Sequence, residues 1–407
     1  MTEADLNLPD PTTQERQEID PDVVDIDADA PEEDAPTADQ ALRYYGVDFD
    51  VEGIVRRFDR GDLIVPSFDP APNDSGAYEG FQRRFVWPKK QMDRFVESLL
   101  LGYPVPGIFL VEEANRRFLI LDGQQRIVTL SAFYRGTYGS PGNEKVFKLE
   151  NVNATLKGLT YKSLTEPDRR LLDSTILQAT VVVPRGKDLE PVYRVFERIN
   201  SSGIKLMPQE IRVALYSGKL IKLIRELNMD QNWRSMFGPP NSRLKDNELI
   251  LRYLALLENA SIVKGFAWDR VEARNDPSLG EKVYKPAMAS YLNAYLSRHR
   301  NLEELDSGKI TEEFRFIAKV LNEAAGRSTL RLDSTQVNAA QTDAVMVGAA
   351  LAMRDGVNIT VESARKSIES LRVLESFRSA VLDSTSHAEN VHSRLKISYE
   401  QFLRDAS

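Results

Sequence analysis

The sequence contains no cysteine and only three histidines, which excludes several kinds of chemistry. Without cysteine there is no disulfide and no thiolate nucleophile, and a reducing cytoplasm is the simplest compartment for such a chain. A zinc site built from cysteine and histidine is not expected either, because its ligands are missing. The three histidines are His299, His387 and His392.

The sequence also lacks long apolar runs. No stretch approaches the length of about 18 apolar residues that a transmembrane helix needs, so we expect no membrane span. The N-terminus shows no basic segment followed by an apolar one, so we expect no secretory signal. Hydrophobic residues make up 42% and charged residues 28% of the chain, as in ordinary water-soluble proteins. At 407 residues the chain can form two or three domains, and we expect it in the cytoplasm.

The net charge of −8 is distributed unevenly. Residues 1–50 hold sixteen acidic residues against Arg16 and Arg43, a balance of −14, which leaves +6 on the remainder of the chain. Residues 1–41 have almost no aromatics and cannot bury enough apolar surface to offset their ordering entropy, so we predict a disordered acidic tail. The tail either keeps the chain soluble or competes for the basic surface of a body that binds polyanions.

Strand and helix patterns both occur in the first half of the chain. Residues 107–111 and 118–121 predict a hairpin that leads directly into a helix, a β-β-α order that differs from the β-α-β units of Rossmann and P-loop domains. Ile176–Val183 is rich in β-branched residues and is followed by proline, which predicts a buried strand. Helices are predicted over Val51–Phe58, Pro88–Leu101, Leu189–Ile199 and Gln209–Tyr216.

Strand signals fade after Ser217, and the remaining patterns have helical spacing. We therefore predict an α/β domain over residues 42–218 and an all-helical domain over residues 219–407. The predicted helices of the second domain are Lys219–Leu227, Asp246–Leu257, Pro286–Arg298, Thr311–Glu323, Thr335–Met353, Val361–Val373 and Asn390–Phe402.

The segment Phe118–Leu130 combines a strand, a turn and a helix. Four apolar residues are followed by Asp122 and Gly123, which signal a turn, and then by an amphipathic run. A strand that enters a helix through Asp-Gly leaves free backbone N–H groups at the helix start, where the dipole adds positive potential. Such a corner can bind an anion, in particular a phosphate. The polar face predicted for this helix consists of Asp122, Gln125, Arg126 and Thr129.

Two interpretations of this corner are open. In the functional one, Gln124 and Gln125 bind a phosphate and a base or sugar edge. Arg126 neutralises charge on a leaving phosphate, and Asp122 holds Mg²⁺ or orients water. In the structural one, Asp122 caps the helix, Arg126 pairs with it at i+4, and the glutamines are solvated.

Two further segments have a functional and a structural interpretation. Arg83, Arg84 and Trp87 interleave basic and aromatic residues, which suits phosphate pairing and base stacking but also suits a core aromatic with arginines at its rim. Residues 198–203, from Arg198 through Asn200 to a glycine, can bind a ligand or form an ordinary helix end.

Other motifs are absent or do not fit. His387, Asn390 and His392 lie within six residues of an apparently helical segment, which does not resemble the ββα-metal arrangement of His-Asn-His nucleases. No Walker A sequence and no Gly-x-Ser-x-Gly elbow occurs, so P-loop and serine-nucleophile chemistry lack support.

Three blocks in this order resemble the GmrSD-type family of prokaryotic proteins: residues 81–87 with Arg83 and Trp87, residues 121–126 with the sequence Leu-Asp-Gly-Gln-Gln-Arg, and residues 196–203. The resemblance covers residues 50–218 well and extends more weakly to Asp246–Arg252. The N-terminal domain of this family is similar to the ParB/sulfiredoxin fold. The implied fold class is therefore α+β, with a ParB/sulfiredoxin-like mixed N-terminal domain followed by an all-helical C-terminal domain.

The resemblance implies anti-phage defence or restriction, through nucleotide-dependent handling of foreign and often modified DNA. In this family the Asp-Gly-Gln-Gln-Arg segment is tied to the binding and hydrolysis of nucleoside triphosphates. Many relatives also carry a C-terminal His-Asn-His nuclease domain. We do not expect this domain here, so we expect that either a partner cuts the DNA or the protein senses and signals. By position, the implied nucleotide-binding residues are Gly123, Gln124, Gln125, Arg83, Arg198 and Asn200, beside Asp122 and Arg126.

We therefore expect a Mg²⁺-dependent nucleoside triphosphatase that acts as a DNA-associated component of a defence or restriction system. Asp122 and Arg126 are the predicted catalytic residues, Asp122 is the predicted metal ligand, and Arg84 and Trp87 are the predicted DNA contacts. The alternatives are a nucleotide- or DNA-binding module without turnover and a ParB-like nuclease that acts with a partner. Expected partners are a nucleotide, DNA and a nuclease or other defence subunit, without a membrane; the chain is also compatible with an oligomer.

Overall fold

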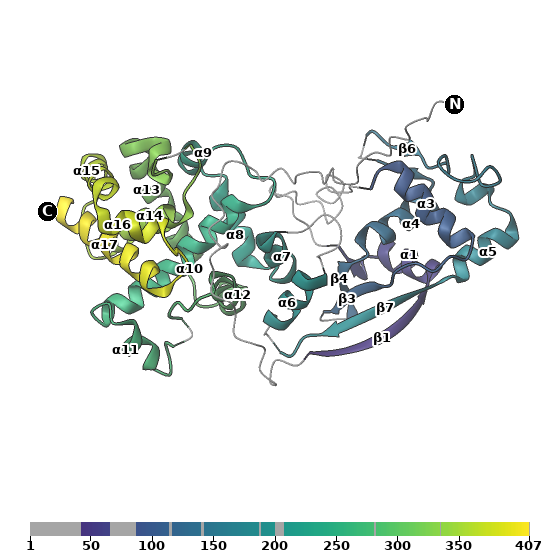
Figure 1. Ribbon diagram of the computed structural model, residues 1–407, viewed down its shortest axis with the longest axis horizontal. Helices are drawn as coiled ribbons and strands as arrows, with labels where there is room; N and C mark the ends of the chain where they lie inside the picture. The colour runs from purple at the N-terminus through teal and green to yellow at the C-terminus, as the bar shows by residue number, and fades with distance from the viewer. Residues whose placement is uncertain are drawn as a thin grey trace, which may run out of the picture.

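The computed structural model describes residues 42–65, 87–113, 116–139, 142–186, 189–199, 207–280, 282–333 and 335–406. Figure 1 shows an elongated molecule with a mixed α/β region at one end and a helical region at the other. The predicted α+β class with a helical C-terminal part is confirmed. The predicted acidic tail lies outside the described residues.

The α/β region is built on a five-stranded mixed sheet with the order β1-β7-β3-β4-β2. β1 pairs antiparallel with β7, β7 pairs parallel with β3, β3 pairs antiparallel with β4, and β4 pairs parallel with β2. The predicted hairpin is therefore confirmed as β3 and β4. The strands are β1 (Arg43–Asp50), β2 (Leu63–Ile64), β3 (Ile108–Glu112), β4 (Phe118–Asp122) and β7 (Ile176–Val183), and β5 (Thr137–Tyr138) and β6 (Lys145–Val146) form a separate pair.

Helices cover both faces of this sheet. Their starts follow local signals: Thr165 caps α5 by accepting a hydrogen bond from the Asp168 N–H, and Pro208 begins α7. The helices of this region are α1 (Val51–Asp59), α3 (Lys89–Leu100), α4 (Gln124–Arg135), α5 (Glu166–Ser174), α6 (Glu190–Ile199) and α7 (Pro208–Leu215).

The helical region follows from residue 219, as the helical spacing of its sequence predicts. The sequence pattern missed α9, α11 and α16 because helices of seven, six and eight residues show too few turns for a clear period. Among the described residues, no helix is long and apolar enough to cross a membrane. The helices are α8 (Lys219–Asn228), α9 (Gln231–Phe237), α10 (Lys245–Gly265), α11 (Arg270–Asn275), α12 (Met288–His299), α13 (Ser307–Ala325), α14 (Ala339–Arg354), α15 (Val361–Val373), α16 (Glu375–Leu382) and α17 (Ala388–Ala406).

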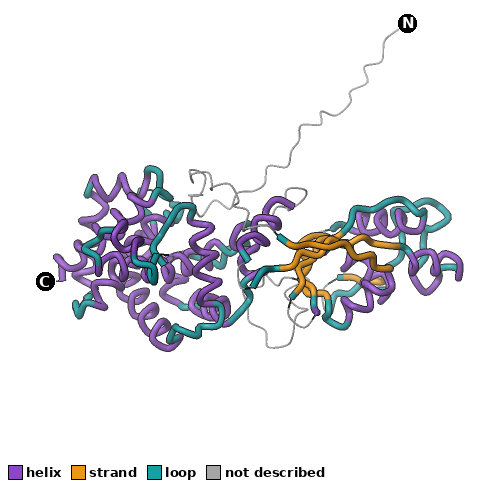
Figure 2. The backbone as a smooth tube through the Cα atoms, turned by 90° about the horizontal axis from the view of Figure 1, so that it is seen from below, coloured by secondary structure: helices purple, strands orange, loops and turns teal. Residues whose placement is uncertain are grey.

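The sheet separates two hydrophobic cores, as the alternation of β4 illustrates. Ile120 points into a core formed with α1, α3, α4 and α5, whereas Leu119 and Leu121 belong to the core that contains α6, α7 and the helical region. Figure 2 shows the strands between these two sets of helices. Both faces of β4 are therefore buried, and the sheet connects the α/β region to the helical region.

A charged triad lies in the middle of the helical region. Asp343 on α14 accepts hydrogen bonds from Arg252 Nε (3.0 Å) and Nη2 (2.6 Å) and from Arg394 Nη2 (3.0 Å). The three side chains are at most 3% exposed. One carboxylate therefore compensates two buried guanidinium groups and joins α10, α14 and α17.

Removal of this carboxylate charge is expected to destabilise the helical region. In Asp343→Asn two buried cations would lose their counter-charge, and breaking a buried ion pair in this way costs about 3–5 kcal/mol. The unfolding transition of the helical region in urea measures the loss. Asp333→Asn, which removes an exposed carboxylate paired with Arg378, is the control and should change stability little. Equal transitions for the two variants would contradict the prediction.

Candidate functional site

The corner between β4 and α4 depends on a glycine. Gly123 has φ = 93°, in the left-handed region, and it immediately precedes the first residue of α4. A Cβ atom at this position would lie only 2.3 Å from Ile108 Cγ2, on the neighbouring strand β3. Both the backbone conformation and the close approach of β3 therefore require glycine here.

Arg126 is bound tightly at this corner. Its Nη2 donates to Asp122 Oδ2 (2.5 Å) and its Nη1 donates to the carbonyl oxygen of Pro106 (2.9 Å). The Arg126 side chain is 10% exposed, whereas the Asp122 side chain is 45% exposed. The pair thus has a buried cation and an accessible carboxylate. The role of Pro106 was missed, because a backbone carbonyl that accepts a hydrogen bond has no sequence signature.

The predicted polar face of α4 is wrong in one respect. Thr129 is fully buried and Arg126 is 8% exposed, so only the part of this face with Asp122 and Gln125 is partly exposed. The Thr129 hydroxyl donates to the Gln125 carbonyl oxygen (2.7 Å), and the Ser131 hydroxyl donates to Asp59 Oδ1 (2.8 Å) on α1. Helices α1 and α3 pack against α4 and cover it, and short polar side chains are tolerated because they find partners inside.

The structural interpretation of Asp122 is half correct. Asp122 pairs with Arg126 at i+4, but it does not cap α4: the capping position is Gly123, which provides no side-chain hydrogen bond. The first N–H groups of α4 are therefore not capped by the side chain at that position. Gln124 and Gln125 in this first turn are partly exposed.

Gln125 connects this corner to the segment predicted to bind DNA. The backbone N–H of Trp87 donates to Gln125 Oε1 (3.3 Å). The indole of Trp87 packs edge-to-face on Phe95, with ring centroids 5.6 Å apart, and is partly buried. The structure therefore brings Trp87 to the corner, with one edge of its ring engaged in the core. Arg83 and Arg84 lie outside the described residues.

Arg198 is not joined to the corner. It lies in the last turn of α6, is exposed, and makes no hydrogen bond or ion pair with any residue that the structure describes. α6 contributes Phe196 to the core on one side of the sheet, and α4 contributes Ile127 to the core on the other side. The two helices therefore pack against opposite faces of the sheet. Asn200 lies outside the described residues.

The three residues of the rejected nuclease pattern do not converge. His392 is buried, with Nδ1 2.6 Å from the Ala388 carbonyl oxygen and Nε2 3.3 Å from Asn259 Oδ1, whereas His387 is exposed. The Asn390 side-chain amide donates to the Asp383 carbonyl oxygen (2.8 Å). Within the described ranges, no three His, Cys, Asp or Glu residues are grouped so that they could hold a metal ion.

Burial makes His392 a pH-sensitive stability element. Desolvation lowers its pKa from 6.5 to about 4, so between these values the unfolded state binds more protons than the folded state. His392 therefore contributes stability above pH 6.5 that is lost as the pH falls towards 4, at most about 3 kcal/mol. His392→Gln should show a shallower fall in unfolding free energy between pH 7 and 4.5 than the wild type. Parallel curves would contradict this assignment.

Substitutions of the two glycines that flank α4 distinguish the cost of backbone strain from the cost of a steric clash. Gly136 closes α4 at φ = 82°, and a Cβ there would meet nothing within 4 Å. Gly136→Ala should therefore cost only the left-handed penalty of about 1–2 kcal/mol. Gly123→Ala should cost about 1–3 kcal/mol more, because its Cβ would also overlap Ile108. Thermal unfolding of the two variants measures the difference, and equal losses would show that β3 can move away from residue 123.

The comparisons with known proteins bear on this α/β region. Residues 73–217 match the family model described as GmrSD restriction endonuclease, N-terminal domain. The matched range contains α3 to α7, the hairpin β3–β4 and strand β7, and so includes the whole β4–α4 corner. No curated protein and no solved structure matches the chain. Over residues 73–217 the chain is therefore similar to the N-terminal domain of GmrSD restriction endonucleases.

Proposed function

We propose that this protein is a nucleotide-dependent component of a DNA restriction system, and that the β4–α4 corner is its nucleotide site. The family supports restriction as the general role, because the matched range is the N-terminal domain of a restriction endonuclease family. The observation that carries the site is the pairing of an accessible carboxylate, Asp122, with a helix start that has no side-chain cap. Both lie within the matched range.

The residues at the corner fit a nucleoside triphosphate with Mg²⁺. Protein sites usually hold Mg²⁺ through one or two carboxylates together with phosphate oxygens and water, so the single carboxylate of Asp122 is sufficient. Asp122 Oδ2 accepts the hydrogen bond from Arg126, whereas Asp122 Oδ1 has no partner among the described residues. Bound Mg²⁺ would neutralise part of the negative charge on the phosphates.

The chain's own groups would have three tasks. The N–H groups of the first α4 turn, with Gln124 and Gln125, would bind phosphate or sugar oxygens, and Gly123 would position this turn by packing on Ile108. Asp122 would orient water or the metal. Arg126, whose two terminal nitrogens are already engaged, would act mainly by holding Asp122 and the Pro106 loop in place.

The engagement of Arg126 also favours a second candidate, a module that binds nucleotide without turnover. A catalytic arginine stabilises charge that develops on the transferred phosphoryl group, and for this it must point at the ligand. A guanidinium that already bonds Asp122 and Pro106 has less capacity to do so. This candidate predicts saturable nucleotide binding without release of phosphate.

Nucleotide turnover by the full chain tests the proposal. Asp122→Ala should lower the turnover of a nucleoside triphosphate with Mg²⁺ about a hundredfold, because the carboxylate that orients the reacting groups is lost. Arg126→Ala should lower it as well and should also weaken nucleotide binding, because the corner loses its link to Pro106. Phosphate release and binding are measured on the same samples.

The exposed pair Glu166 and Arg170 on α5 provides matched controls, because it has the same i,i+4 spacing on another helix. Glu166→Ala and Arg170→Ala should retain wild-type turnover. Equal rates in the wild type and the Asp122 variant, or no phosphate release from any of them, would refute the enzymatic role. Saturable binding without release would then identify the binding module.

A further inference from the structure

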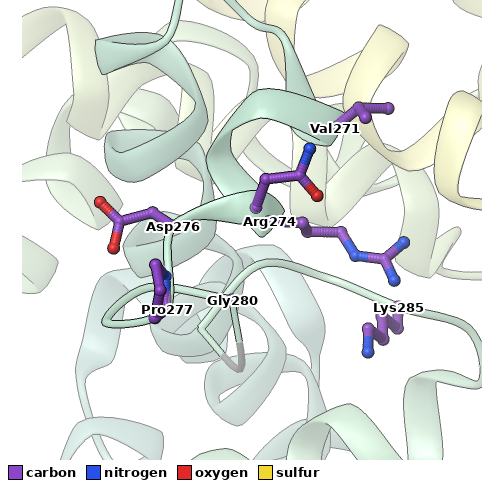
Figure 3. A pocket seen from close by; sticks show the side chains of 7 residues that line it. Val271, Arg274, Asp276, Pro277, Gly280 and Lys285 are labelled. Carbon is purple, nitrogen blue, oxygen red and sulfur yellow. The ribbon is translucent and has the colours of Figure 1, made fainter.

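A hollow of about 470 Å³ lies beside α11, in the helical region and outside the range that matches the family. It is formed where the end of α11 meets the loop that leads towards α12. Figure 3 shows the hollow and the side chains around it. The lining residues are Val271, Arg274, Asn275, Asp276, Pro277, Gly280 and Lys285.

Two exposed cationic side chains line the hollow. Arg274 and Lys285 are exposed, and neither makes a hydrogen bond or ion pair with any residue in the described part of the chain. Asp276 is the one carboxylate among the described lining residues, and its Oδ1 accepts hydrogen bonds from Ser278 N–H (2.8 Å) and Oγ–H (2.6 Å). In Figure 3 this carboxylate lies on the opposite side of the hollow from Arg274 and Lys285. Within the described part of the lining, no carboxylate therefore pairs with these cations.

The framework under these cations is fixed. Arg274 follows Ala273, and Lys285 follows Tyr284; both preceding residues are fully buried. The Tyr284 N–H donates to Asn259 Oδ1 (2.9 Å), so the backbone at Lys285 is held from inside the helical core. The two cations consequently project from an anchored backbone, so that a ligand has to order only their side chains.

The loop opposite α11 lies directly against the end of that helix. A Cβ at Gly280 would lie 2.8 Å from the Arg274 carbonyl oxygen, so the loop touches the end of α11 through a residue without a side chain. The Gly280 N–H donates to the Asp276 carbonyl oxygen (2.9 Å), which closes the turn. The described backbone segments on the two sides of the hollow are thus in direct contact.

We infer that this hollow binds a phosphate group. A guanidinium offers a planar fork of donors to phosphate oxygens, and a neighbouring ammonium adds a point charge. The position of Arg274 in the last turn of α11 suits the helix dipole on its own, but Lys285 lies outside the helix and is not explained in that way. The phosphate belongs either to a DNA backbone or to a small phosphate compound, since the two share this chemistry. This inference does not rest on nucleotide turnover at the β4–α4 corner.

The test compares two double variants of the full chain that remove equal charge. R274Q/K285Q removes the cations of the hollow, and R315Q/K319Q removes an exposed arginine and lysine from α13 that also have no partner among the described residues. Affinity for a fluorescently labelled DNA duplex is measured by anisotropy over a series of KCl concentrations. Binding of inorganic phosphate is measured by calorimetry, and unaltered circular dichroism confirms folding.

If the DNA backbone is the source, R274Q/K285Q should bind the duplex about five- to tenfold more weakly than R315Q/K319Q at low salt. Its slope of log affinity against log salt should also be smaller by about 1. If a small compound is the source, DNA affinity is equal in the two variants and the phosphate isotherm is lost only in R274Q/K285Q. Equal behaviour of the two variants towards both probes would overturn the inference.

Discussion

Contacts with the start of β3 fix the position of the first turn of α4. Gly123 packs against Ile108 at a distance that no side chain allows, and Arg126 reaches the carbonyl oxygen of Pro106 two residues earlier. Both contacts join the start of one strand to the start of the helix that follows the next strand. The direction in which β4 enters α4, and therefore the exposure of Asp122, depends on this packing. A larger residue at position 123 would move all of these groups together.

The sheet that carries the β4–α4 corner does not form a domain separate from the helical region. Leu119 and Leu121 lie in the same core as α6, α7 and the helical region, while the helices around Ile120 form the other core. Polar contacts reinforce the connection, because Asn293 on α12 donates to Glu190 on α6 and accepts from Arg212 on α7. The family range ends at residue 217, yet its last two helices share their core with the helices that follow. Sequence family and hydrophobic core therefore divide the chain at different places, and the predicted boundary at residue 218 stays a prediction.

Local signals in the sequence were sufficient for the hairpin, the Asp-Gly turn and the longer helices, because each depends on residues close together in the chain. Strand β1 was not predicted: Arg43–Asp50 contains a glycine and two aspartates, and it becomes a strand because β7 offers eight partners in register. The buried polar face of α4 was also not predictable, since it depends on α1 and α3 covering Thr129 and Ser131 from distant parts of the sequence. The i,i+4 pair of Asp122 and Arg126 was one of two interpretations of the sequence. The unequal burial of its two members was not predicted, because the contact of Arg126 with the Pro106 carbonyl oxygen has no sequence signature.

The β4–α4 corner and the hollow beside α11 use opposite arrangements of charge. At the corner the Arg126 cation is buried and bound by Asp122 and the Pro106 carbonyl oxygen, and the Asp122 carboxylate remains accessible. A carboxylate repels a phosphate unless a metal ion lies between them, so this arrangement suits a phosphate that arrives with Mg²⁺. In the hollow Arg274 and Lys285 remain exposed, and the Asp276 carboxylate lies on the opposite side, which suits a phosphate without a metal. The same ligand group would thus be bound in two electrostatically distinct ways, and removal of Mg²⁺ should abolish binding at the first place and leave the second unchanged.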